Sequence, residues 1–285
     1  MCNLNPQQQM KKLGKKDYLK VVEPLKGVKI NNLFARAVVE NHVSGKVYVN
    51  DVNKPTTFYV VHPYGMSLLF GKHDNNDFNK EFKEYALNRN NNRDSHEWMQ
   101  AFPKNWDVEL KELFNDHFIK SSNNKTNQTK NIIELNTRVN FKFNLNKYEE
   151  LKREIKVPKK TVIRTGKKEF ESIEGAVIPS NFWNNADDFL KNGFGFSTYW
   201  NNELACTAFS SVKMETFLEL GMETVSKFRG KGLAQYTCSK LIDYCLENDY
   251  EPIWACRLEN IGSYILAQKL GFDVSLQIPY YRLSN

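Results

Sequence analysis

The sequence contains no apolar run long enough to cross a bilayer, and no apolar signal-peptide core follows Met1. Its five cysteines are irregularly spaced and form neither a C-x-x-C pair nor a Cys/His cluster, which argues against the common zinc sites. The sequence also lacks G-x-G-x-x-G and the Gly-Lys-Ser/Thr ending of a P-loop, so dinucleotide and nucleoside-triphosphate sites fit poorly. We therefore expect a cytoplasmic protein with reduced cysteines, no membrane association and no metal.

The charge is unevenly distributed over the 285 residues. Residues 1–165 carry 29 lysines and arginines against 18 acidic residues, whereas residues 166–285 carry 11 against 15. This shift predicts two domains, residues 1–160 and 161–285, with the boundary in the lysine-rich stretch that contains Pro158. The lysines of the first part are scattered among asparagines and are not clustered with aromatic residues, so a solvated surface is a better interpretation than a nucleic-acid site.

The first part has the pattern of a small α/β domain. Residues 1–40, 77–87 and 108–118 predict helices, while residues 45–71 and 137–143 predict strands. The second part predicts more elements, in this order: an edge strand at 173–177, a short helical region at 179–191, a hairpin of 193–198 and 204–211 around Asn201-Asn202, a long strand at 217–225, a helix at 233–248, a strand at 252–256, a helix at 260–270 stopped by Gly271, and strands at 272–278 and 280–283.

One turn in the second part suits anion binding. Arg229-Gly-Lys-Gly-Leu-Ala234 lies between the long strand and the helix at 233–248. The first backbone N–H groups of a helix lack internal partners, and the helix dipole places partial positive charge at the same end. Gly230 and Gly232 remove side chains, so a diphosphate can approach the backbone. Taken alone, the same pattern also fits a simple tight turn between a strand and a helix.

The order of the surrounding motifs resembles the GNAT superfamily of acyl-CoA-dependent N-acetyltransferases. The family pattern Arg/Gln-x-x-Gly-x-Gly/Ala after a long strand is matched by Arg229 to Ala234. A downstream strand and an Asn-led helix ending in Lys-x-Gly-Phe are matched by Trp254 to Asn260 and by Lys269-Leu-Gly-Phe272. The resemblance covers roughly residues 170–285. It implies a mixed sheet flanked by helices, and acetyl-CoA as the acyl donor.

The resemblance also implies roles for individual residues. The backbone of the strand at Met222, Glu223 and Thr224 would pair with the pantetheine arm. The diphosphate would be held at the turn by Arg229, Gly230, Lys231, Gly232, Leu233 and Ala234. Asn260, Ser263 and Lys269 would lie along the cofactor. Asn260 also fits a plain helix N-cap, and the two roles are compatible.

A closer resemblance, to the zwittermicin A resistance family, rests on Leu218-Glu-Leu-Gly-Met-Glu-Thr224, on Gly232-Leu-Ala234, and on the N-terminal extension with Tyr64-Gly-Met-Ser-Leu-Leu-Phe-Gly71. It implies acetylation of an amine on a small molecule. By fold analogy, the N-terminal part is a candidate for a degenerate acetyltransferase-like sheet or a substrate domain.

Amine acetylation requires a base, an oxyanion donor and, in some enzymes, an acid. Glu219 and Glu223 are the base candidates, because odd positions of the long strand share one face. We favour Glu223, and take a backbone N–H near Met222 as the oxyanion donor. Many family members carry a tyrosine seven residues after the Asn, but this chain has Ala267 there. Tyr264 is the replacement that we favour, and the alternatives are Tyr280 and Tyr281 on the last strand.

Two functions remain open from the sequence. The first is an N-acetyltransferase acting on a primary amine of a small molecule, with antibiotics among the candidates. The second is a non-catalytic protein that binds acetyl-CoA or a partner on the same scaffold, which Ala267 and the basic N-terminal half favour. Neither the acceptor nor the oligomeric state can be read from the sequence.

Overall fold

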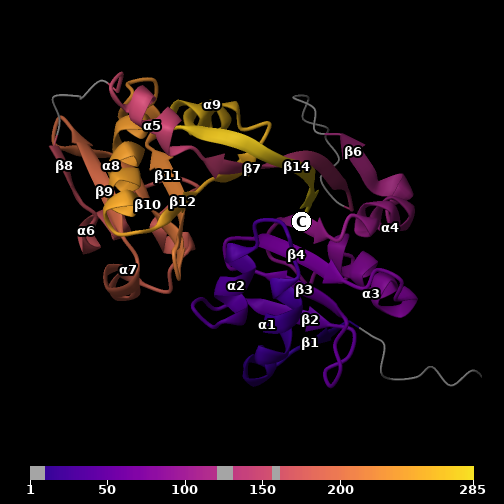
Figure 1. The fold of residues 1–285 in the computed structure, drawn as a ribbon. Helices are drawn as coiled ribbons and strands as arrows, with labels where there is room; N and C mark the ends of the chain where they lie inside the picture. The colour runs from indigo at the N-terminus through magenta and orange to yellow at the C-terminus, as the bar shows by residue number, and fades with distance from the viewer. Residues whose placement is uncertain (1–9, 121–130, 156–160) are drawn as a thin grey trace, which may run out of the picture. The chain divides into compact units, whose positions relative to one another are not determined.

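The computed structural model describes residues 10–120, 131–155 and 161–285. The chain forms two compact units. Unit 1 is Met1–Arg138 with Ile278–Asn285, and unit 2 is Val139–Gln277. The chain therefore passes between the units twice, within the two long strands β7 and β14 (Figure 1). The predicted boundary at residue 160 borders the undescribed residues 156–160 and falls within the sequence span of unit 2.

Unit 1 is built on one mixed sheet with helices beside it (Figure 1). Its elements are β1 (Lys11–Lys12), η1 (Lys15–Asp17), α1 (Leu19–Lys26), α2 (Leu33–Val39), β2 (Lys46–Val49), β3 (Thr57–Val61), β4 (Met66–Gly71), α3 (Asn76–Ala86), β5 (Glu97–Phe102), α4 (Asn105–Leu113), η2 (Asn115–His117) and β6 (Phe118–Lys120). The strand order is β1-β2-β3-β4-β5, followed by the end of β14 (Phe272–Leu283). β4 and β5 are parallel, and β14 pairs with β5 antiparallel.

The core of unit 1 follows from the two-residue alternation of its strands. Tyr59, Leu69 and Met99 face α3 and α4, where they pack against Phe82 and Trp106. The intervening strand residues point to the opposite face, and α2 packs against β3 and β4. The helix predicted at 77–87 and the strands predicted at 45–71 are confirmed.

Unit 2 contains a five-stranded sheet in the order β12-β11-β10-β9-β8. Its elements are β7 (Ile133–Phe143, shared with unit 1), α5 (Leu145–Lys152), β8 (Thr161–Arg164), α6 (Lys167–Ser172), η3 (Pro179–Asn181), α7 (Ala186–Asn192), β9 (Gly195–Trp200), β10 (Glu203–Met214), β11 (Phe217–Thr224), η4 (Ser226–Phe228), α8 (Leu233–Glu247), β12 (Glu251–Ile253), β13 (Ala255–Arg257) and α9 (Ile261–Lys269). A second group of strands in this unit joins the start of β14 to β7 and β13.

Helix α8 lies against β9, β10 and β11 (Figure 1). The apolar stripe predicted from the sequence is the buried one: Cys238, Leu241, Ile242 and Cys245 are all buried and pack against Leu218 and Leu220 of β11. Helix α8 is also bound by α5, because the Tyr148 hydroxyl donates to Asp243 Oδ1 at 2.8 Å. Helix α8 is thus fixed from the sheet side and from α5.

The α/β class is confirmed, and so are the hairpin, the long strand and the helices that begin near residues 233 and 260. The hairpin turns at Asn201 and Asn202, both with positive φ, a conformation that asparagine tolerates. The helix predicted at 108–118 ends at Leu113 and is followed by η2 and β6. Three predictions for the later part of the chain are wrong. Residues 173–177 form no strand, the strand predicted at 252–256 is interrupted at Trp254, and the two C-terminal strands are one continuous strand. Within the described residues, no helix has the length and apolar character needed to span a membrane.

Candidate acyl-CoA site

The strands β11 and β12 pair over only part of the length of β11. They pair in parallel from Phe217↔Glu251 to Glu219↔Ile253, and the described pairing ends there. β11 continues to Thr224, whereas the chain after Ile253 passes to β13, which is a neighbour of β7. The separation leaves one edge of β11, beyond Glu219, without β12 beside it.

The direction of the backbone groups on β11 follows from a single hydrogen bond. Val225 donates its N–H to Ala205 O of β10 at 2.9 Å. In an antiparallel pair, residues that hydrogen-bond to the partner strand alternate with residues whose backbone groups point away. The backbone N–H and C=O groups of Glu223 and Gly221 therefore point toward β10. Those of Met222 and Thr224 point toward the edge of β11 that β12 no longer covers. This is the side where we expected backbone groups to meet a pantetheine arm.

The turn after β11 is open on its glycine side. Gly230 and Gly232 both have φ of 77°, and a Cβ built on either would meet nothing within 4 Å. Gly232 precedes α8, and no side chain of the described residues caps that helix start. We call the turn from Arg229 to Ala234 the glycine cradle. The backbone amides at the start of the fifteen-residue helix α8, from Leu233 onward, thus point outward beside this turn. Such a geometry binds phosphate groups.

The basic side chains of the turn lie against protein groups. Arg229 donates from Nε to Thr224 O at 3.1 Å and from Nη2 to Glu223 Oε1 at 3.2 Å. Lys231 Nζ lies 5.1 Å from the centroid of the Trp200 ring. In this arrangement the turn itself offers mainly its backbone to an anion.

The two candidate bases share the β11 face opposite α8, as the alternation predicted. Gly221 on that face lies against the Phe209 ring, since a Cβ there would be 2.5 Å from Phe209 Cζ. Glu219 is 5% exposed and stands at the last β11–β12 pair. Glu223 is 7% exposed, and its two oxygens accept from Ala176 N, Val177 N, Thr224 N and Arg229 Nη2.

The Asn-led helix α9 begins with the cap that the sequence allowed. Asn260 Oδ1 accepts from Ser263 N at 3.3 Å, and Ser263 Oγ accepts from Trp254 Nε1 at 3.2 Å. Lys269 lies at the other end of α9, where its carbonyl accepts from Gln235 Nε2 of α8. The last turn of α9 is therefore tied to the first turn of α8, next to the glycine cradle.

The acid candidates lie in different parts of the chain. Tyr264 is half-buried on α9, with its ring 5.7 Å from that of Phe141, and Ala267 is fully buried one turn later. Tyr280 and Tyr281 belong to unit 1. There, Tyr280 stacks on Trp98 and Tyr281 donates its hydroxyl to Asp107 at 2.8 Å.

The sequence analysis did not identify a hydrogen-bonded pair formed by Tyr199 of β9 and Glu169 of α6. Tyr199 donates to Glu169 Oε1 at 2.6 Å, and Glu169 Oε2 accepts from Gly166 N. Burial opposes ionisation of Glu169, but these hydrogen bonds prevail and lower the pKa of its carboxyl, while the bond from Tyr199 raises the pKa of that phenol to about 12. The available sequence signal is the glutamate three residues after Gly166, since an N3 glutamate can accept from the N-cap backbone N–H.

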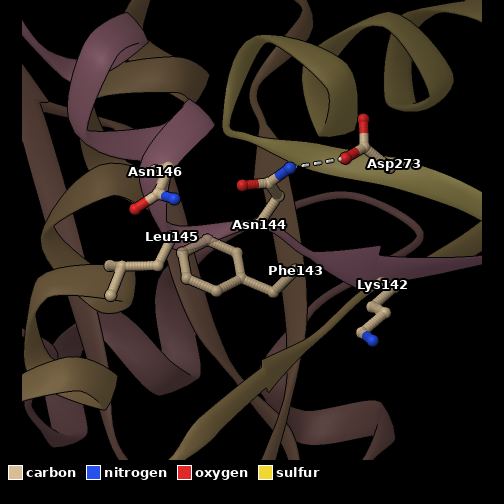
Figure 2. Close-up of a pocket in the computed structure, with 6 residues that line it drawn as sticks. All are labelled: Lys142, Phe143, Asn144, Leu145, Asn146 and Asp273. Atoms are coloured by element: carbon tan, nitrogen blue, oxygen red, sulfur yellow. Dashed lines mark hydrogen bonds between the residues drawn. The ribbon is translucent and has the colours of Figure 1, made fainter.

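A separate cavity of about 390 Å³ lies at the start of α5, lined by Lys142, Phe143, Asn144, Leu145, Asn146 and Asp273 (Figure 2). Two of its polar residues, Asn144 and Asp273, bind each other. Asn144 Nδ2 donates to Asp273 Oδ2 at 3.0 Å, and Asn144 Oδ1 caps α5 by accepting from Lys147 N. We therefore interpret this cavity as part of the scaffold and not as the acyl-CoA site.

Comparisons with known proteins identify the family of the chain. The family model for GNAT acetyltransferase matches residues 24–281, and the chain belongs to this family. It is similar to an uncharacterized N-acetyltransferase, YdfB, of Bacillus subtilis, with 24% identity over 87% of this chain and 89% of the relative. It is therefore an acyltransferase by family.

Solved structures show the same fold. A GCN5-related N-acetyltransferase-like protein of Streptococcus suis superposes with a TM-score of 0.68 at 19% identity, covering 94% of this chain and 99% of the other. A tandem GNAT protein from the clavulanic acid biosynthesis pathway superposes with a TM-score of 0.58 at 8% identity, covering 96% and 98%. Both likenesses concern the fold.

Proposed function

We propose that this protein transfers the acetyl group of acetyl-CoA to a primary amine of a small molecule. The observation that carries the proposal is the opening of β11 beside the glycine cradle. The opening turns the Met222 backbone toward the space that β12 leaves, and the cradle follows β11 within the next ten residues. A pantetheine arm extends from a diphosphate, so an exposed strand edge that ends at an anion cradle fits that shape.

The residues of the turn and strand have distinct parts in the proposal. The amides from Arg229 to Ala234 hold the diphosphate, and the Met222 backbone pairs with the pantetheine. Asn260, Ser263 and Lys269 line the cofactor from the α9 side. Thr224 contributes less than the resemblance implied, because its carbonyl already accepts from Arg229 and its N–H already donates to Glu223.

In the chemical step, the amine nitrogen forms a bond to the thioester carbonyl carbon, and the carbon–sulfur bond breaks. We assign Glu219 as the base that takes the proton from the ammonium, in place of Glu223, since the oxygens of Glu223 already accept four N–H bonds. The Met222 N–H stabilises the oxyanion, and Tyr264 supplies a proton to the departing thiolate. A thiolate is also a tolerable leaving group, so the loss of Tyr264 is expected to slow the reaction without abolishing it.

We further propose an antibiotic-type amine as the acceptor, in line with the resemblance to the zwittermicin A resistance family, and a cytoplasmic site of action. Unit 1 would act as a degenerate acetyltransferase-like sheet that contributes to substrate binding. The fold similarity to a tandem GNAT protein supports that part of the proposal.

Thiol release from acetyl-CoA, measured with a panel of small primary amines that includes polyamines and aminoglycosides, tests the function. We expect release with at least one amine, above the rate without amine, together with calorimetric binding of acetyl-CoA. Binding without release from any amine would favour the alternative, a non-catalytic acetyl-CoA-binding protein. No binding at all would exclude both.

A further inference from the structure

Glu223 joins two segments that are far apart in sequence. Its Oε2 accepts from the backbone N–H groups of Ala176 at 2.9 Å and Val177 at 3.0 Å. Its Oε1 accepts from Thr224 N and from Arg229 Nη2, both at 3.2 Å. One carboxylate thus binds the end of β11, the first residue of the glycine cradle, and the segment at 173–178 between α6 and η3.

The segment at 173–178 is shaped around this carboxylate. Gly175 has φ of 153°, and a Cβ there would lie 2.3 Å from Glu223 Cδ and 2.4 Å from its Oε2. Ala176 is tied a second time, because its carbonyl accepts from Asn181 Nδ2 at 2.9 Å. A side chain at residue 175 would overlap the Glu223 carboxylate. The hydrogen bonds from Ala176 and Val177 to Glu223 therefore require a glycine at residue 175.

The saturation of Glu223 argues against a direct role in proton transfer. A carboxylate offers about four lone-pair positions, and four N–H donors use them here. A base must direct a lone pair at the ammonium that it deprotonates. Glu223 would have to give up one of these bonds before it could do so, and three of the four come from backbone N–H groups, which are costly to leave unpaired.

We propose that Glu223 is a positioning residue that couples the cofactor turn to the segment at 173–178, so that occupation of the turn by CoA stiffens this segment. The coupling path is Arg229 to Glu223 to the amides of Ala176 and Val177. The inference rests on the proposed function, because it takes the turn as the CoA site. It goes further by assigning the segment at 173–178 as the part of unit 2 whose order depends on the cofactor.

Amide hydrogen exchange at Ala176 and Val177, measured with and without CoA, tests the coupling. In the wild-type protein, CoA is expected to slow exchange at both amides by at least threefold. In Glu223→Gln, one half of the carboxamide is a donor and can no longer accept. Exchange without CoA should therefore rise about tenfold, and CoA should no longer slow it although calorimetry still shows CoA binding. Glu174→Gln makes the same change of charge at a neighbouring exposed residue and should behave like wild type.

Gly175→Ala provides a second route to the same state, because its Cβ must displace the carboxylate while leaving its charge intact. Because alanine is also strained at the positive φ of residue 175, the decisive result is the lost CoA effect, and this result keeps the test valid if Glu223→Gln folds poorly. A kinetic readout separates positioning from base catalysis: Glu223→Gln should keep the acidic limb of the kcat/KM profile, which the loss of a base would remove.

The failures are distinguishable. Wild-type protein that does not bind CoA would contradict the proposed function. CoA that binds to wild type without slowing exchange at Ala176 and Val177, or an acidic limb that disappears in Glu223→Gln, would overturn the positioning role alone.

Discussion

Gly271 lies so close to Tyr148 that a Cβ at residue 271 would be 2.7 Å from the Cα of Tyr148. The sequence explained this glycine as the residue that stops α9, and its φ of 80° agrees with that explanation. The structure adds a second reason, namely the close approach of the α5 backbone. Both constraints disfavour a Cβ on the glycine of the Lys-Leu-Gly-Phe motif.

Gly271→Ala is therefore expected to destabilise the protein by about 2–4 kcal/mol, since it adds a left-handed alanine to an overpacked contact with backbone. Urea unfolding measures the effect. Gly262→Ala on α9 is the control, because its Cβ would be 3.8 Å from the nearest atom, an ordinary contact. Equal stability of the two variants would contradict the account of Gly271.

Gly232→Ala separates backbone strain from cofactor binding. The new Cβ meets no protein atom within 4 Å, so the stability cost is limited to about 1–2 kcal/mol from the left-handed backbone. The Cβ occupies the side from which a diphosphate would approach, and we expect at least a tenfold loss of CoA affinity by calorimetry. Gly65→Ala, at another glycine with positive φ but in unit 1, should lose stability and keep CoA affinity.

Glu219→Gln tests the proposed base. Removing a general base typically lowers the rate by roughly 100- to 10,000-fold, so kcat should fall by about that factor and the acidic limb of the kcat/KM profile should disappear. Binding of acetyl-CoA should stay within about threefold of wild type. A variant that retains both full turnover and the acidic limb would remove Glu219 from the base role.

His62 predicts a pH dependence of stability that is independent of catalysis. Burial lowers the pKa of its imidazole from 6.5 to about 4, and Nδ1 accepts from Tyr64 N at 3.1 Å. The folded state thus favours the neutral ring, and the stability that this provides is present above pH 6.5. As pH falls from 6.5 to about 4, the histidine gains a proton in unfolded chains but not in folded chains. This difference lowers the free energy of unfolding by about 3 kcal/mol in all.

Replacement of this histidine should flatten that part of the profile. Chemical denaturation at pH 7 and at pH 5 is expected to show a smaller difference for His62→Gln than for wild type. His42→Gln, at an exposed histidine, should keep the wild-type difference. A His62→Gln profile as steep as that of wild type would contradict the buried neutral ring.

The parts of the site that the sequence predicted depend on local signals. The turn from Arg229 to Ala234 contains glycines where φ is positive, Asn260 is a residue type that caps helices, and α8 has one apolar stripe. Each of these features is set by residues within a few positions of one another, so periodicity and turn chemistry were sufficient.

The parts that the sequence did not predict depend on distant partners. Residues 173–177 have the composition of a strand, but their amides donate to a carboxylate 46 and 47 residues away and not to a neighbouring strand. Together with the bonds from Thr224 and Arg229, this contact brings the N–H donors on Glu223 to four, which is the reason that we propose Glu219 in its place as the base. The pairing of the end of β14 with β5 is also non-local, because the paired residues are more than 180 positions apart in the sequence.

The most direct test of the central claim is a crystal structure of the protein with CoA bound. We predict diphosphate oxygens within hydrogen-bond distance of backbone amides between Arg229 and Ala234, and the pantetheine arm beside the Met222 backbone. A CoA molecule held elsewhere, with the glycine turn empty and the Met222 edge uncovered, would contradict the account.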